Sequence, residues 1–176
     1  MPDATPEVVV LIGNPRSGSR TSAIATAVAE AIRTEGDGIE VRTVELADAI
    51  AVSLDGTAAQ PVAPQPDLID VVRSARLLVV ATPSYKGSYT GLLKLVFDQL
   101  PHQSLDGITA VPVVVAGAPV HLRTTTADLI RLLTELGAAV PATVELLEAD
   151  LASAGPHIAR AARQTAAHVF AVSPTS

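Results

Sequence analysis

The sequence predicts an α/β fold in three layers, with a five-stranded parallel sheet in the order 2-1-3-4-5 between helices. Short apolar runs alternate with amphipathic stretches five times along the chain, which is the pattern of repeated βα units. Most of these runs are apolar throughout, as expected for strands buried on both faces. Five strands fit this order better than the six-stranded order of dinucleotide-binding folds. We expect residues 1–176 to form one domain.

The elements follow from local patterns taken in chain order. The expected strands are residues 7–13, 39–46, 76–83, 111–118 and 142–147. The expected helices are residues 19–36, 67–75, 91–100, 124–137 and 156–171. Apolar residues recur at helical spacing in the first helix, and Gly36 and Gly38 end it. Residues 53–66, SLDGTAAQPVAPQP, are rich in turn formers and predict one long loop.

Proline and capping residues set several of these boundaries. Pro101 ends the third helix. Pro112 should lie at the start of its strand, because proline has no N–H to donate to a neighbouring strand. Thr125 and Asp128 resemble a capping box at the start of the fourth helix, and Gly137 resembles its C-cap.

Composition excludes several classes of function. The net charge of −6 and the pI near 5.1 argue against a general nucleic-acid or anionic-membrane binder. The chain has no cysteine, and its four histidines show no metal-ligand spacing, so we expect neither thiolate chemistry nor a metal site. The start, MPDATPEVVV, has no signal-peptide pattern, and no apolar run approaches the roughly 18 residues that span a bilayer. We therefore expect a cytoplasmic protein.

Three loops should meet at one edge of the sheet. In the predicted strand order, the ligand crevice lies at the carboxyl ends of the first and third strands, and the loop after the fourth strand approaches from the side. These loops are residues 13–21, 83–91 and 116–124. The sequence therefore predicts one ligand contacted by all three.

The first loop, GNPRSGSRT, has the chemistry of a phosphate site. Gly13 lets the chain turn sharply off the strand. The hydroxyls of Ser17, Ser19 and Thr21 and the guanidinium of Arg20 come at the start of a helix, where free N–H groups and the helix dipole favour an anion. The alternative is that Ser19 only caps the helix.

The second loop, in the stretch TPSYKGSYTGLLK, contains both tyrosines and both lysines of the chain. In a sequence with 2% aromatic residues, the pair Tyr85 and Tyr89 indicates a ligand surface. Residues 84–87 can run past a flat ring, with Gly87 allowing close approach. The alternative is that the tyrosines cover a helix end or lie at a subunit contact.

The helix after this loop and the third loop carry weaker signals. Apolar residues cover more than one face of helix 91–100, which favours a homodimer or homotetramer contact over core packing alone. The third loop, AGAPVHLRT, turns on Gly117 and carries His121. No Ser, His and acid set can be assembled from the sequence.

At these residues the chain resembles the NAD(P)H-dependent FMN reductase family of flavodoxin-like fold. The nearest likeness is to reductases that supply reduced flavin to alkanesulfonate monooxygenases. The motifs that carry it are GNPRSGSRT, ATPSYKGSYTGLLKLVFDQLP and AGAPVHL, within about residues 8–136. The chain departs from the family pattern at Asn14, where serine is common, and at Ala116, Ala118 and Pro119 in the third loop.

The resemblance implies an FMN cofactor and NADPH or NADH as the hydride donor. It implies that the FMN phosphate is bound by Ser17, Ser19, Arg20 and Thr21. The flavin ring would lie against Pro83, Ser84, Tyr85, Lys86 and Gly87, with Gly117 near its pyrimidine end. Asn14, Arg16 and His121 complete the implied cofactor-binding set. No catalytic side chain is implied, because hydride passes directly between two stacked rings.

Three activities remain open at this point. The first is an NAD(P)H:FMN oxidoreductase that releases reduced flavin to a partner monooxygenase. The second retains FMN and reduces quinones, azo dyes or other acceptors. The third is a non-enzymatic flavin-binding or electron-transfer module, or a regulatory domain whose flavin site has been lost. The sequence does not choose between NADH and NADPH.

Overall fold

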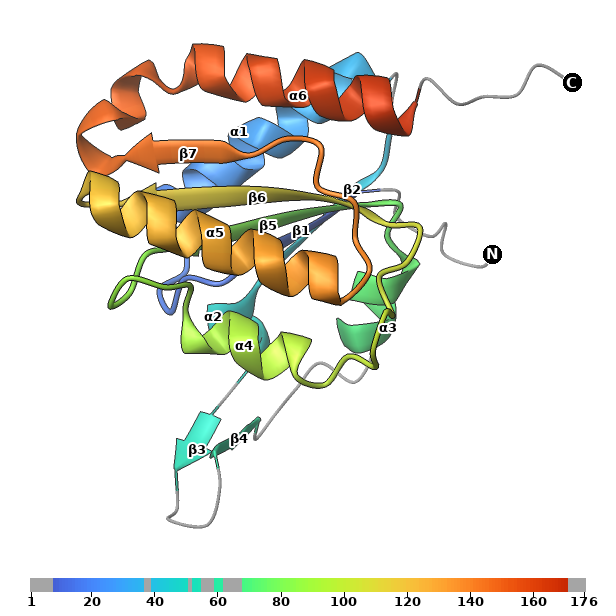
Figure 1. Ribbon diagram of the computed structural model, residues 1–176, viewed down its shortest axis with the longest axis vertical. Coiled ribbons are helices and arrows are strands. Elements are labelled where there is room, and N and C mark those ends of the chain that lie inside the picture. Colours follow the sequence, from blue (N-terminus) through green and yellow to red (C-terminus); the bar gives the residue numbers. More distant parts are fainter. Residues whose placement is uncertain (1–7, 37–38, 51, 55–58, 62–67, 171–176) are drawn as a thin grey trace, which may run out of the picture.

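A five-stranded parallel sheet forms the centre of the molecule (Figure 1). The computed structural model describes residues 8–36, 39–50, 52–54, 59–61 and 68–170. The strands of the sheet are β1 (Val8–Ile12), β2 (Val41–Glu45), β5 (Leu77–Pro83), β6 (Thr109–Ala116) and β7 (Val144–Leu147). Their spatial order is β2-β1-β5-β6-β7, with every pair parallel. This is the predicted order 2-1-3-4-5, so the flavodoxin-like prediction is confirmed.

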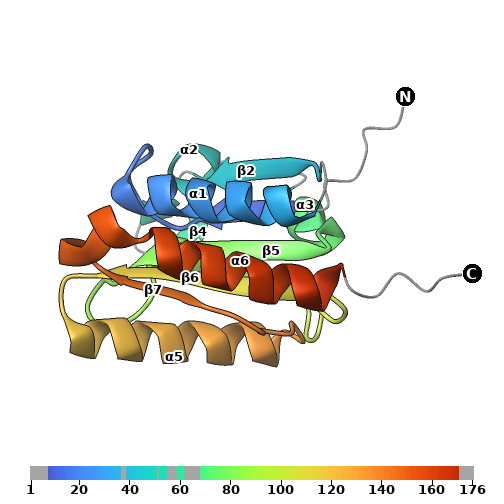
Figure 2. The same cartoon turned by 90° about the horizontal axis from the view of Figure 1, so that it is seen from above.

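Helices cover both faces of this sheet, which gives the three predicted layers (Figures 1 and 2). One face is covered by α1 (Arg20–Glu35) and α6 (Gly155–Val169). The other face is covered by α2 (Leu46–Ala49), α3 (Leu68–Ser74), α4 (Gly91–Phe97) and α5 (Pro119–Glu135). A short 3-10 helix, η1 (Glu148–Ser153), connects β7 to α6.

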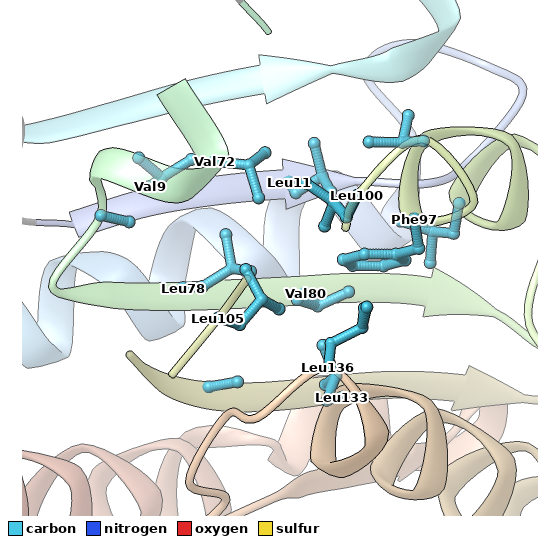
Figure 3. Close-up of a cluster of buried hydrophobic side chains, with 14 of the residues drawn as sticks. Val9, Leu11, Val72, Leu78, Val80, Phe97, Leu100, Leu105, Leu133 and Leu136 are labelled. Carbon is cyan, nitrogen blue, oxygen red and sulfur yellow. The ribbon is translucent and has the colours of Figure 1, made fainter. Parts of the chain in front are cut away.

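The core consists of two aliphatic layers, one on each face of the sheet. Because successive side chains of a strand point to opposite faces, Val9 and Leu11 of β1 belong to one layer, and Val8, Val10 and Ile12 belong to the other. Figure 3 shows the first layer, where the ring of Phe97 from α4 packs among aliphatic side chains. All five residues of β1 are fully buried, as expected for a central parallel strand.

The segment predicted as one long loop, residues 53–66, is partly regular. Two short antiparallel strands, β3 (Val52–Leu54) and β4 (Ala59–Pro61), pair with each other outside the main sheet. The prediction was therefore wrong for these residues, while the remainder of the segment lies outside the described residues. Pro61 ends β4, a position where a missing N–H is tolerated.

Pro112 lies inside β6, not at its start as predicted. The strand begins at Thr109, and Pro112 is opposite Val80 of β5. Hydrogen bonding alternates sides along a parallel strand: Thr109 N–H donates toward the β5 side and Ala110 N–H toward the β7 side. By this alternation, Pro112 faces β7, whose register with β6 begins only at the next residue, Val113. The proline therefore removes no hydrogen bond between paired strand residues.

The fourth helix begins earlier than predicted. Helix α5 starts at Pro119, so the proposed capping box was wrong and Thr125 lies fully buried inside the helix. Proline is favoured at this first position because its missing N–H would have no helical partner anyway. Gly137 follows the helix with φ +98°, in agreement with its predicted role at the C-terminus.

Candidate functional site

A pocket of about 350 Å³ opens at the carboxyl edge of the sheet. The loops after β1 and β5 emerge at this end of the molecule (Figures 1 and 2). The lining residues of this edge pocket are Asn14, Arg16, Ser17, Gly18, Ser19, Arg20, Thr21, Pro83, Tyr85, Val115 and Glu148. Eight of them belong to the predicted cofactor-binding set. A pocket of equal volume beside β2, α2 and α3 contains no predicted site residue.

The loop after β1 presents backbone donors to this pocket. Ser19 is the N-cap of α1, and its Oγ accepts the Ser22 N–H at 3.2 Å. Its own hydroxyl proton is still available, because a serine hydroxyl can donate while it accepts. In the described part of the chain, the N–H groups of Ser17, Ser19, Arg20 and Thr21 have no acceptor. Four free donors at a helix N-terminus form an anion-binding surface.

Two of the predicted phosphate-loop residues direct their side chains into the loop itself. The Asn14 Oδ1 accepts the Arg16 N–H at 2.9 Å, and its Nδ2 donates to the Thr21 Oγ1 at 3.5 Å. Asn14 and Thr21 are both buried. Asn14 therefore braces the loop from inside, and Thr21 offers the pocket its backbone N–H.

Two carboxylates lie against the same loop. Glu45, at the end of β2, accepts the Gly18 N–H at 3.2 Å and the Ser22 hydroxyl at 2.5 Å, both on Oε1. Its Oε2 is buried without a partner among the described residues. Glu148, directly after β7, accepts from the Arg20 Nη2 at 2.8 Å. Arg20, the predicted phosphate cation, and Arg16, the other cation of this loop, are both exposed.

Gly13 is needed for packing, not for the sharp turn that we predicted. Its φ is not in the left-handed region. A Cβ at this position would lie 2.3 Å from Leu93 Cγ on α4, far inside van der Waals contact. The Gly13 carbonyl also accepts the Thr90 hydroxyl at 2.5 Å, and the Gly13 N–H donates to the Ala81 carbonyl at 2.8 Å. These contacts fix the first loop against β5 and α4.

The second loop is a tight two-residue hairpin. Tyr85 and Ser88 exchange backbone hydrogen bonds of 2.9 and 3.2 Å, and both central residues have positive φ, +54° at Lys86 and +82° at Gly87. These are the signs that a type I′ turn requires. Pro83 and Tyr85 line the edge pocket, and 47% of Tyr85 is exposed. The Tyr85 side chain is therefore accessible to a molecule that enters the edge pocket.

The rest of the second loop faces α5. The Ser84 hydroxyl shares a 2.7 Å hydrogen bond with the Thr125 hydroxyl, and the Gly87 carbonyl accepts from the Thr124 hydroxyl at 2.8 Å. Ser84, Lys86 and Gly87 do not line the edge pocket. Their predicted contact with the flavin ring would therefore lie at the rim of the edge pocket.

The two tyrosines do not share a site. Tyr89 is half-buried in a groove of about 270 Å³ between α4 and α5, with Lys94, Asp128 and Arg131. Burial raises the pKa of the Tyr89 hydroxyl, and Lys94 opposes this rise. The structure therefore favours the alternative for Tyr89, that it covers a helix end or lies at a subunit contact.

The third loop is shorter than predicted because α5 begins at Pro119. Gly117 is exposed, and a Cβ there would have no protein atom within 4 Å, so its backbone is open to an approaching ligand. His121 lies in the first turn of α5, and its Cδ2 is 4.0 Å from a Cβ built on Gly87. Neither residue lines the edge pocket. The β6 residue that does is Val115.

Sequence reasoning missed Gly18, Val115 and Glu148 in the lining. Gly18 has φ +63°, a conformation that favours glycine, and it is central in the predicted loop. Glu148 directly follows the fifth strand, so its position at the carboxyl edge follows from the predicted topology. The expectation of no metal site was based on spacing alone; within the described ranges, no three His, Asp or Glu side chains form a cluster that could hold a metal ion.

The family model for NADPH-dependent FMN reductases matches residues 6–150 of the 176-residue chain. The chain belongs to this family. The resemblance inferred from the three loop motifs is thus confirmed, and the family match continues beyond residue 136 through β7. The matched residues include Glu148, which lies outside the three loop motifs.

Members of this family differ in the reactions after which they are named. The chain is 35% identical over 120 residues to the NADH-dependent FMN reductase SfnF of Pseudomonas putida, covering 65% of this chain and 62% of that protein. It is 30% identical over 158 residues to an FMN-dependent NADPH-azoreductase of Staphylococcus aureus, covering 82% and 78%. Across three curated FMN reductases, the match spans only 58–62% of each relative's length.

A solved structure agrees with the fold. The apo form of the NADH:FMN oxidoreductase EmoB superimposes with a TM-score of 0.77 at 25% identity, covering 96% of this chain and 91% of that one.

None of the described helices is both long enough and apolar enough to span a bilayer.

Proposed function

We propose that this protein is an NAD(P)H:FMN oxidoreductase, acting as one cytoplasmic domain of residues 1–176. It would take hydride from NADH or NADPH and release reduced FMN to a partner monooxygenase. The observation that carries the proposal is the edge pocket, where free loop N–H groups and an exposed tyrosine line one cavity. Membership of the FMN reductase family supports it.

The residues present fit a flavin mononucleotide. A volume of about 350 Å³ is within the usual range for small-molecule sites. The free N–H groups of Ser17, Ser19, Arg20 and Thr21 suit the terminal phosphate, which carries about −1.5 to −2 charges. Pro83 and Tyr85 offer flat surfaces to the ring, and the open backbone at Gly117 offers donors to its far end.

Positioning is the main contribution that we assign to the chain's own residues. FMN, when bound, supplies a ring that accepts hydride from a nicotinamide. The hairpin at residues 84–88 would hold that ring on a rigid turn, braced by Thr124 and Thr125 from α5. No side chain of the pocket need act as an acid or base, because reactivity depends on the distance and alignment of two rings.

A second candidate is a reductase that retains FMN and passes electrons to an azo or quinone acceptor. The match to the S. aureus azoreductase favours it, since that match covers more of both chains than the match to SfnF does. The two candidates differ in whether flavin leaves the protein. A protein that retains its FMN would purify with a yellow colour in a stoichiometric amount.

One assay separates these candidates. Purified protein is mixed with NADH or NADPH in air, with and without added FMN, and nicotinamide absorbance is followed. We expect oxidation that requires free FMN and saturates with it. Turnover without added FMN that rises with an azo dye would favour the second candidate. Absence of turnover with either nucleotide at every FMN concentration would contradict both.

A further inference from the structure

Arg20 carries a predicted phosphate contact and is already engaged by a carboxylate. Its Nη2 donates to the Glu148 Oε2 at 2.8 Å, and both side chains line the edge pocket. The two residues are separated by 128 positions in the sequence, with Arg20 in the first turn of α1 and Glu148 after β7. This ion pair therefore joins two elements, α1 and the segment after β7, at the edge pocket.

The pair is of a kind that a stronger anion can displace. One nitrogen meets one oxygen, and the side chains are 65% and 47% exposed. Exposed ion pairs of this type are weak. A phosphate group offers three acceptor oxygens and a larger charge to the same guanidinium.

The local charge is balanced before any ligand arrives. Arg16 and Arg20 supply two positive charges at the loop, and Glu45 and Glu148 supply two negative charges. Glu45 also uses the Gly18 N–H, which would otherwise face an anion. An incoming phosphate therefore meets a loop with little net positive charge.

We propose that Glu148 is a specificity-determining residue that weakens FMN binding by holding Arg20 away from the flavin phosphate. This inference rests on the proposed function and deepens it. Because FMN must displace Glu148 from Arg20 and then lie beside a free carboxylate, its affinity is lowered and its release is fast. Fast release suits a flavin that leaves the protein as reduced product. Riboflavin, which has no phosphate, does not experience this competition.

The test compares Glu148→Gln with the unmodified protein. Glutamine keeps the shape of the side chain and removes the charge. The dissociation constants for FMN and riboflavin are measured by fluorescence quenching of each flavin. We expect FMN to bind about threefold to tenfold more tightly in the variant, because a weak ion pair and a like charge are both removed. Riboflavin affinity should not change.

A matched control is available on the same helix. Glu30→Gln breaks the Arg33–Glu30 pair, which has the same 2.8 Å distance and similar exposure but does not line the pocket. This control should leave both flavin affinities unchanged. In high salt, where charges are screened within a few ångströms, the advantage of Glu148→Gln should shrink.

A double variant tests whether Glu148 acts through Arg20. In an Arg20→Ala background, the gain from Glu148→Gln should shrink to the part that comes from removing the like charge, because no guanidinium remains to be freed. An undiminished gain in that background, or equal tightening of FMN and riboflavin, would overturn the proposal. So would unchanged FMN affinity in Glu148→Gln. If the unmodified protein bound no FMN at all, the proposed function would fail instead.

Discussion

At the scale of single residues, Arg20 is the side chain whose role in the edge pocket is easiest to isolate. It is exposed, it belongs to the first turn of α1, and its contact with Glu148 is a surface contact. Its replacement should therefore disturb the fold little. Any loss of FMN binding in an Arg20 variant can then be attributed to the lost contact between Arg20 and FMN.

Arg20→Ala should weaken FMN binding about tenfold to a hundredfold, since a hydrogen bond to a charged group contributes about 1.5–3 kcal/mol. Riboflavin binding should fall little, because riboflavin lacks the phosphate. Flavin titrations of both proteins measure this, with Arg33→Ala as a control at the other end of α1. Equal losses for the two flavins would contradict a phosphate role for Arg20.

Several residue types in the site could be predicted from the sequence, but their partners could not. The density of serine, threonine and arginine after the first strand indicated an anion site, and the four free N–H groups of this loop agree with it. The sequence did not show that Asn14 and Thr21 bond to each other, or that Ser84 turns toward Thr125. Such pairs depend on side-chain directions set by packing between elements.

At the scale of elements, helix α4 exposes part of its apolar surface. Leu93, Val96 and Phe97 are buried against the sheet, whereas Leu92 and Leu95 are only half-buried. The groove that Tyr89 and Leu132 line lies between this helix and α5. The predicted homodimer or homotetramer contact through residues 91–100 stays a prediction, and these half-buried residues are where it would form.

Leu95→Glu should convert the assembly to monomers, because a charge buried at an interface without a partner is costly. Analytical ultracentrifugation of both proteins measures the mass. Ala167→Glu, which adds the same charge at an exposed site on α6, should leave the mass unchanged. A monomeric unmodified protein, or a variant with the same oligomeric mass, would contradict the predicted contact.

The start of α5 was predicted too late along the chain for a physical reason. The sequence TTTAD suggested a helix start at residues 124–128, but α5 begins at Pro119 behind Ala118, which has no side chain able to cap it. Thr125 lies instead inside the helix, where its hydroxyl forms a hydrogen bond with the Ser84 hydroxyl. Tertiary contacts decided this boundary, and local capping signals could not reveal them.

At the scale of the whole molecule, strand order decides which loops can meet. The order β2-β1-β5-β6-β7 places the carboxyl ends of β1 and β5 side by side, with β6 and β7 next to them. Because this order could be predicted from five apolar runs, the convergence of the first two loops could be predicted too. Glu148 was not anticipated because it lies after the last strand, where no motif drew attention.

The most direct test of the central claim is a crystal structure of the protein with saturating FMN. The account predicts the phosphate within hydrogen-bond distance of the free backbone N–H groups of Ser17, Ser19, Arg20 and Thr21. It predicts the ring beside Tyr85 and the turn at residues 84–88. FMN bound at another surface, or an edge pocket without FMN in such crystals, would contradict it.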